Sequence, residues 1–201
     1  MKKSFIFPII FMVLITAIFT FVLAFLNQST AERVALNQEI ELSRKILYIF
    51  DIKPPSEKPE DVLKVFDEKI SSMPYEDGLV YVYHGDEGQV LGYAVPVSGP
   101  GLWGSVEAYV GISHDYSTIL GIDFIRHSET PGLGGRISED DFKEQFRGLD
   151  LTKASDGNYI IYRPAPGGNV DAIAGATLTS KSVSNIINED LHRFLKERGN
   201  S

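Results

Sequence analysis

Two short segments of the chain hold residue types that could take part in chemistry. The first, from Glu129 to Gly135, reads Glu-Thr-Pro-Gly-Leu-Gly-Gly. Its three glycines and one proline predict a loop whose backbone can approach a ligand closely. Thr130 offers a hydroxyl inside this loop, and Leu133 offers an apolar contact. An ordinary turn would have the same composition, so both interpretations stay open for this segment taken alone.

The second segment, from Asp171 to Ser180, reads Asp-Ala-Ile-Ala-Gly-Ala-Thr-Leu-Thr-Ser and precedes a strongly amphipathic pattern. A helix N-terminus presents unpaired N–H groups and the positive end of the helix dipole, so a phosphate on or near Thr177 would be stabilised there. Gly175 and Ala176 leave room for a bulky group, and Thr179 and Ser180 add hydroxyl donors. The alternative is a plain N-cap run that only begins the helix.

Other patterns that resemble known sites lack the structural context those sites need. Gly99 to Gly104 fits G-x-G-x-x-G, but a strand pattern follows where a dinucleotide site needs a helix, so we expect a turn between two strands. The P-loop and nucleophile-elbow patterns are absent, and the four histidines form no i,i+3 or i,i+4 pair. The lack of cysteine excludes disulfides and thiolate sites. We therefore expect neither a metal site nor a set of catalytic side chains.

The composition narrows the class of protein. The chain has 201 residues with 27 acidic and 19 basic side chains, which gives a formal net charge of -8. A nucleic-acid-binding protein needs a basic surface, so this balance argues against a nucleic-acid partner. With 43% hydrophobic and 23% charged residues, the chain is not disordered overall.

Residues 1–30 have the composition of a transmembrane anchor. A run of 22 residues from Phe5 to Leu26 is interrupted only by one proline and two threonines, and as a helix it would span about 33 Å, enough for the hydrocarbon core of a bilayer. The alternative is a cleaved signal peptide with Ser29-Thr30-Ala31 as its cleavage site. Lys2 and Lys3 favour an N-terminus in the cytoplasm, with the rest of the chain outside. We expect a single-pass protein of the cytoplasmic (inner) membrane.

The rest of the chain predicts a stalk and a folded domain. Residues 31–58 are expected to form a helical stalk with a proline-containing linker, and residues 59–201 the domain, which opens with a short helix at Pro59. From Gly78 the apolar residues alternate with a period of two, which predicts strands. The expected strands are 79–84, 89–97, 105–112, 118–126 and 158–163, and the later helices are 138–146 and 180–197. Ser138 and Asp141 have the spacing of a capping box. The expected fold class is α+β, a mostly antiparallel sheet with packed helices.

Three stretches, taken in this order, resemble the FMN-binding domain family of membrane redox complexes. They are Gly101-Leu102-Trp103, residues 127–135 with the sequence His-Ser-Glu-Thr-Pro-Gly-Leu-Gly-Gly, and residues 171–180. The members that the chain resembles most are the C subunit of the sodium-pumping NADH:quinone oxidoreductase and the G subunit of the Rnf-type electron transport complex. The resemblance covers roughly residues 91–195 together with the N-terminal anchor.

The resemblance implies a covalently bound cofactor. In that family FMN is joined through its phosphate to the threonine of a Gly-Ala-Thr motif, which corresponds to Thr177. An exported flavin transferase forms this bond, and Asp171 matches the acid of its recognition motif, whereas the family usually has Ser or Thr where this chain has Ala174. Within the loop that would contact the isoalloxazine ring, Thr130 is the expected hydrogen-bond partner and Leu133 the apolar contact. The other residues expected at the cofactor are Glu129, Gly132, Gly134, Gly175, Ala176, Leu178 and Thr179.

The function that the resemblance implies is electron relay within an ion-translocating membrane oxidoreductase complex, not catalysis on a small substrate. Its partners would be the other membrane subunits, and the domain would lie on the periplasmic or extracellular side. A tether through the phosphate would keep FMN on the chain while leaving the redox chemistry of the ring free. Three alternatives stay open, namely a stand-alone extracytoplasmic FMN electron carrier, a non-enzymatic binding or assembly module, and an exported hydrolase.

Overall fold

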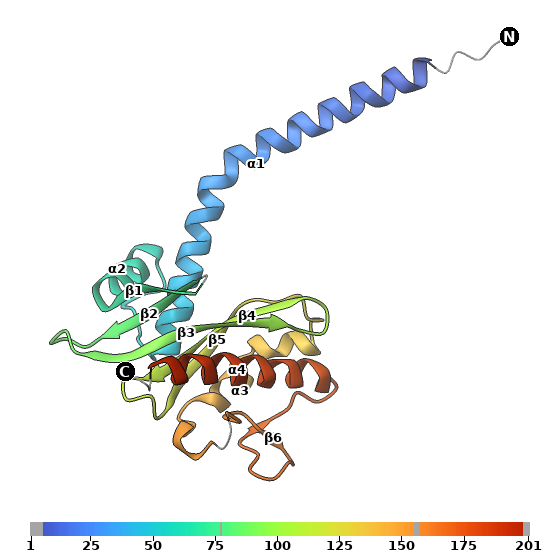
Figure 1. The fold of residues 1–201 in the computed structure, drawn as a ribbon. Coiled ribbons are helices and arrows are strands. Elements are labelled where there is room, and N and C mark those ends of the chain that lie inside the picture. The colour runs from blue at the N-terminus through green and yellow to red at the C-terminus, as the bar shows by residue number, and fades with distance from the viewer. Residues whose placement is uncertain (1–5, 77, 155–156, 199–201) are drawn as a thin grey trace. The chain divides into compact units, whose positions relative to one another are not determined.

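The computed structural model describes residues 6–76, 78–154 and 157–198 and divides into two units, Met1–Glu41 and Leu42–Ser201. The first unit contains the N-terminal part of helix α1 (Ile6–Ile49), which is apolar and long enough to cross a membrane (Figure 1). A signal sequence would have the same features. The helix runs without interruption through positions 30 and 31, where the sequence predicts that the anchor meets the stalk. Lys2 and Lys3, on which the expected orientation depends, lie outside the described residues.

The second unit is built on a five-stranded antiparallel sheet. Its strands lie in the order of the chain and are β1 (Ile70–Tyr75), β2 (Gly78–His84), β3 (Val90–Pro100), β4 (Ser105–Ser113) and β5 (Ile119–Arg126). Short turns join successive strands, which allows antiparallel neighbours to pair. Between β3 and β4 the N–H of Gly101 donates to the carbonyl oxygen of Gly104 at 2.7 Å. The G-x-G-x-x-G pattern is therefore a turn between strands, as predicted.

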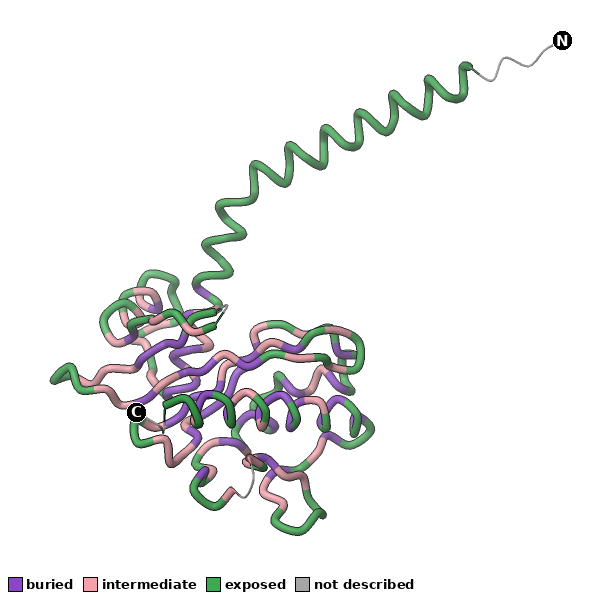
Figure 2. Tube along the Cα trace, in the orientation of Figure 1, coloured by how far each residue is buried: buried purple, intermediate pink, exposed green. Residues whose placement is uncertain are grey.

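Helices pack against each face of the sheet. Successive strand residues point to opposite faces, so Val95 packs on the side of α4 (Thr177–Arg198) and Ala94 on the other side. To the larger core α4 contributes Val183, Ile186, Ile187, Leu191 and Phe194. The opposite face is covered by the end of α1 and by α2 (Pro59–Lys69), through Ile46, Leu47, Ile49, Phe50 and Val62. Buried residues accordingly follow the strands, whereas residues 6–39 of α1 are exposed throughout (Figure 2). The predicted α+β class is confirmed.

The end of α1 lies close to the sheet because two paired positions are glycine. Gly111 in β4 faces Gly121 in β5. A Cβ atom on Gly121 would lie 2.6 Å from the carbonyl oxygen of Ile49, and one on Gly111 would clash with the Ile49 side chain. Arg147 fixes this helix end, since its guanidinium donates to the carbonyl oxygens of Tyr48 and Ile49, both at 3.1 Å. A larger side chain at either glycine would push the helix end away.

The helix predicted over residues 138–146 is corrected. The structure has a 3-10 helix (Gly134–Ser138), one α-helical turn, α3 (Asp140–Lys143), and a second 3-10 turn (Glu144–Phe146). The predicted capping box is wrong, because the hydroxyl of Ser138 is hydrogen-bonded to Nε2 of His127 at 2.9 Å and the N-cap, Glu139, makes no side-chain cap bond. The hydroxyl of Ser138, which the sequence pattern assigned to the start of a helix, thus forms a tertiary contact with His127 instead.

Further elements and boundaries differ from the predictions. The strand predicted over 158–163 is reduced to β6 (Tyr162–Arg163), which pairs in parallel with β7 (Val170–Asp171). The preceding backbone bonds to side chains instead, since the N–H of Ile160 donates to Asn188 at 2.8 Å. Strand β1 lies where no strand was predicted. Helix α4 begins at Thr177, three residues before the predicted start, and a further 3-10 turn spans Leu151–Lys153.

Candidate functional site

The three stretches singled out in the sequence meet at one carboxylate. Glu129 follows β5, and its Oε1 accepts the backbone N–H groups of Leu102 at 2.8 Å and Trp103 at 3.1 Å. Its Oε2 accepts the hydroxyl of Thr179 at 2.5 Å. Glu129 therefore joins the turn 101–104, the loop 129–135 and the first turn of α4, which lie far apart in the sequence.

Glu129 is buried and carries a negative charge at neutral pH. Only 5% of the residue is exposed. Burial raises the pKa of the carboxyl, but the hydrogen bonds from Thr179, Trp103 and Leu102 together outweigh that effect, so the pKa lies below its usual value. The anion is thus stabilised by neutral donors. Across the described parts of the chain, no Lys or Arg forms an ion pair with it.

Glycines leave the space that this carboxylate occupies. A Cβ atom on Gly101 would lie 2.6 Å from Oε1 of Glu129, and one on Gly134 would lie 2.7 Å from Oε2. Gly132 has a φ of +72°, a left-handed conformation that favours glycine, and it lies in a turn in which the N–H of Leu133 donates to the carbonyl oxygen of Thr130 at 3.1 Å. The glycines of the loop therefore serve both its turn and its packing around Glu129.

Thr177 is the first residue of α4, and it is exposed. The chain before it is held in place, because the N–H of Ala176 donates to the carbonyl oxygen of Ile173 at 3.0 Å and the N–H of Ile173 donates to Oγ of Ser180 at 3.0 Å. Gly175 has a φ of +78°, and a Cβ atom there would lie 3.4 Å from Cδ2 of Leu133. The Thr177 side chain is thus accessible at the helix N-terminus, beside the glycine-rich loop.

Exposed apolar side chains gather around these segments. Leu102, Trp103, Leu133 and Leu178 are exposed by 46%, 69%, 48% and 62%. Among the described residues of the second unit, Leu79, at 40%, is the only other large apolar side chain that is exposed to this degree. Several exposed large apolar side chains in neighbouring segments are typical of a surface that a ligand or a partner covers.

The predicted polar residues have different environments. Thr130 is exposed, and so is Asp171, whose carboxylate pairs with Nη1 of Arg163 at 2.8 Å. Thr179 and Ser180 are buried. The hydroxyl of Thr179 donates to Glu129, so this predicted donor already has an acceptor, whereas the hydroxyl of Ser180 accepts the N–H of Ile173. Within the described ranges, no group of three or more His, Cys, Asp or Glu could hold a metal ion.

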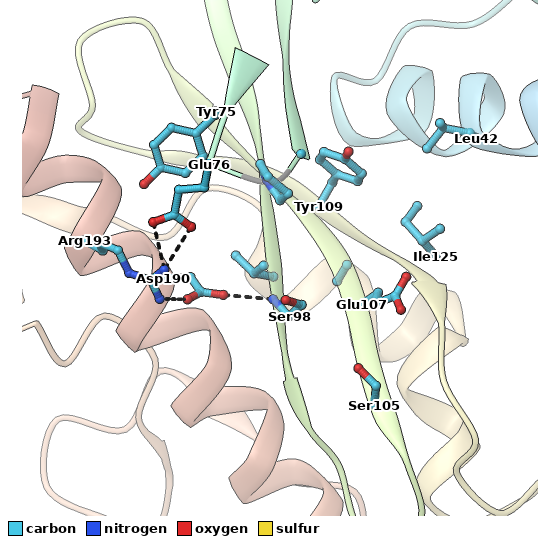
Figure 3. A pocket seen from close by; sticks show the side chains of 14 residues that line it. Leu42, Tyr75, Glu76, Ser98, Ser105, Glu107, Tyr109, Ile125, Asp190 and Arg193 are labelled. Carbon is cyan, nitrogen blue, oxygen red and sulfur yellow. Dashed lines mark hydrogen bonds and ion pairs between the residues drawn. The ribbon is translucent and has the colours of Figure 1, made fainter. Parts of the chain in front are cut away.

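A groove of about 480 Å³ lies at the other end of α4 (Figure 3). Arg193 donates to both carboxylate oxygens of Glu76 at 2.9 Å, and Asp190 accepts the N–H of Ser98 at 2.8 Å. None of the residues predicted at the cofactor lines this groove.

Sequence reasoning missed two features of the site. It used Leu102 and Trp103 as marks of a resemblance and did not assign them to the site, although both are exposed beside it. It also expected Glu129 at the cofactor and did not predict that the carboxylate binds other segments of the protein. The sequence signal was the pair Gly101 and Gly104, which flank the two apolar residues. Glycines at this spacing could have indicated a tight turn that exposes Leu102 and Trp103 at the surface.

The comparisons with known proteins agree with the predicted family. Residues 101–192 match the family described as FMN-binding domain. The chain is 38% identical over 114 residues to the C subunit of the Na(+)-translocating NADH-quinone reductase of Yersinia pestis, covering 54% of this chain and 43% of that protein. It is 40% identical over 112 residues to the G subunit of the ion-translocating oxidoreductase complex of Methanosarcina acetivorans, covering 54% and 56%. The matched part thus spans about half the length of these relatives.

Solved structures share the fold. NqrC of Shewanella oneidensis superposes with a TM-score of 0.65 at 20% identity, covering 80% of this chain and 99% of that one. The C subunit of the Na(+)-translocating NADH-quinone reductase of Parabacteroides distasonis gives a TM-score of 0.64 at 25% identity, covering 81% and 93%. Residues 101–192 are therefore similar to the FMN-binding domain family, which is the family that the three stretches predicted.

Proposed function

We propose that this chain is a membrane-anchored flavoprotein that relays electrons within an ion-translocating oxidoreductase complex, with FMN joined through its phosphate to Thr177. The observation that carries the proposal is the exposed Thr177 hydroxyl at the first residue of α4, beside exposed apolar side chains, in a region similar to the FMN-binding domain family. The relatives named above, which are subunits of ion-translocating complexes, support the wider role.

The residues around Thr177 fit FMN. The first N–H groups of an α-helix have no acceptor within the helix, so a phosphate on Thr177 would be stabilised by them and by the helix dipole. The isoalloxazine ring is large and apolar on its faces, and Leu133 and Leu178 offer it apolar contact. Thr130 offers an exposed hydroxyl to its polar edge. Leu102 and Trp103 extend the apolar surface on the side of the turn 101–104.

The chain itself would bind and orient the cofactor. When bound, FMN supplies reversible electron transfer. The carboxylate in the centre of the site, Glu129, has both oxygens occupied by protein donors. It is therefore poorly suited to act as a general base. This arrangement favours electron relay over proton-transfer catalysis on a small substrate.

The membrane part of the proposal is supported by the apolar segment of α1. We propose that α1 anchors the protein in the cytoplasmic membrane, that the domain lies on the periplasmic or extracellular side, and that other subunits of the complex surround it. An exported flavin transferase would attach FMN and would recognise the segment with Asp171, whose carboxylate is accessible at the surface.

The attachment is tested with the full chain co-expressed with a flavin transferase. After denaturing electrophoresis the chain should show a fluorescent flavin band, and its intact mass should exceed the bare chain by one covalently bound FMN. Thr177→Ala should remove both signals, whereas the control Thr130→Ala, at another exposed threonine of the site, should keep them. A band that persists in Thr177→Ala would refute the attachment residue. A wild-type chain of bare mass would favour the non-enzymatic binding or assembly module instead.

A further inference from the structure

We infer that Glu129 is a positioning residue that holds the turn 101–104, the loop 129–135 and the first turn of α4 in one arrangement. This inference rests on the proposed function, because the three segments present the side chains that would contact FMN. One oxygen of Glu129 binds the turn and the other binds Thr179. The arrangement of the apolar surface would then be set before the cofactor arrives.

The chemistry of the group explains why it can join three segments. A carboxylate accepts at both oxygens, and bonds to a charged acceptor are stronger than bonds between neutral groups. Thr179 lies 50 residues from Glu129 in the sequence, and Leu102 lies 27 residues away. Because Glu129 has no ion pair among the described residues, these donors are what stabilises its buried charge. The loss of any one donor leaves that charge less stabilised and favours a rearrangement of the carboxylate.

Close packing around the Glu129 carboxylate fixes its position. Gly101 and Gly134 approach the two carboxylate oxygens so closely that neither position has room for a Cβ atom. Glu129 itself is almost fully buried. A change at Thr179 would therefore alter the carboxylate and, through it, the backbone of the turn at Leu102 and Trp103. No direct contact between Thr179 and the turn is needed for this effect.

Amide hydrogen exchange tests this coupling. The full chain carries Thr177→Ala so that no flavin is attached, and the readout is the exchange rate at Leu102 and Trp103 divided by the rate in strands β1 and β2. Thr179→Val removes the hydroxyl at nearly constant volume and should raise this ratio about tenfold. Thr179→Ser keeps the hydroxyl and should leave the ratio within about twofold of its original value.

A second pair of variants changes the carboxylate itself. Glu129→Gln should raise the same ratio, whereas the matched control Glu139→Gln, at an exposed glutamate that pairs with Arg136, should not. An unchanged ratio in Thr179→Val and Glu129→Gln would overturn the inference. So would an equal rise at the turn and in β1 and β2, because that result indicates a general loosening of the domain.

Attachment of FMN is then measured separately, in chains that retain Thr177. With a flavin transferase present, Thr179→Val should slow attachment several-fold relative to Thr179→Ser. If exchange responds as expected but the wild-type chain never acquires flavin, the positioning role stands and the proposed function fails. If flavin is attached but the exchange ratio does not respond, the proposed function stands and the positioning role fails.

Discussion

Strand β5 contains one buried carboxylate, Asp123, and leads directly to another, Glu129, and the two are stabilised differently. Oδ2 of Asp123 accepts a hydrogen bond from Nζ of Lys143 at 3.1 Å, and both side chains are buried. Lys143 also lies 4.0 Å from the ring centre of Tyr48, near the end of α1. Among the described residues, Glu129 accepts hydrogen bonds from neutral donors only, and these lie in two segments, the turn 101–104 and the first turn of α4.

This difference separates a contact that fixes the fold from one that assembles a site. An opposite charge beside Asp123 compensates its loss of water, so the pair joins α3 to the sheet without needing other segments. Backbone N–H groups and a hydroxyl beside Glu129 compensate that charge only while the turn, the loop and α4 remain together. We therefore expect a change at the Asp123 pair to lower the stability of the whole domain most. A change at Glu129 should lower that stability less and should loosen the local site first.

The largest effect should follow Lys143→Met, which leaves Asp123 buried without its cation. The free energy of unfolding should fall by about 3–5 kcal/mol, as for other broken buried pairs. Denaturant unfolding of the full chain in detergent measures it. Asp140→Asn, which removes the exposed second partner of Lys143, is the control and should cost less than about 1 kcal/mol. A loss below about 1 kcal/mol in Lys143→Met would contradict the distinction between the two carboxylates.

A smaller effect is expected from Glu129→Ala. The hydroxyl of Thr179 and the N–H groups of Leu102 and Trp103 would lose their acceptor, which costs about 1–3 kcal/mol for a buried donor. We expect a total of about 3 kcal/mol, less than three full losses, because the two N–H groups lie in a turn whose side chains are exposed and can gain water. The same unfolding measurement applies, with Glu139→Ala as control. A loss above that of Lys143→Met would reverse the comparison.

The sequence predicted well the elements that depend on a repeated local pattern. Val183, Ile187 and Leu191 recur at helical spacing, and α4 follows. The strand β1 was missed because Ile70 to Tyr75 contains Pro74 and two serines, which weaken a strand pattern. Its position at the edge of the sheet tolerates such residues. The helix over 138–146 was overestimated because its short acidic pattern does not exclude 3-10 turns.

The candidate site divides in the same way. Composition and resemblance identified the loop and the Gly-Ala-Thr segment as parts of one site, but they did not assign the turn 101–104 to it. That the hydroxyl of Thr179 faces Glu129 was not predictable, because a contact across 50 residues depends on how α4 packs on the sheet. A hydroxyl in the first turn of a helix could donate a hydrogen bond to a bound phosphate or to a group inside the protein. The burial of Thr179 is what identifies its role as internal.

A smaller effect is expected in the pH dependence of the free energy of unfolding, when the wild type is compared with Glu129→Gln. The pKa of Glu129 is lower in the folded chain than in the unfolded chain. Its ionisation therefore stabilises the fold above the unfolded pKa of about 4.3, and this contribution is lost as the pH falls through the folded pKa. The unfolding free energy of Glu129→Gln should lie below that of the wild type at pH 7, by about 1 kcal/mol. The two should converge once the pH has fallen through the folded pKa of Glu129, which lies below its usual value. A difference that stays constant with pH would exclude a role for the charge.

The smallest effect on stability is expected at the outer, apolar side of the same site. Leu178 is mostly exposed, so Leu178→Ser should change the free energy of unfolding by less than about 0.5 kcal/mol. Its proposed role is to contact the flavin, so in the chain that carries FMN the variant should increase quenching of flavin fluorescence by iodide about twofold. Leu79→Ser is the matched control, because Leu79 is also exposed but lies in β2 and should leave quenching unchanged. Equal quenching in both variants would mean that the exposed leucine at the start of α4 does not shield the ring, and that the surface around Glu129 is arranged for some other contact.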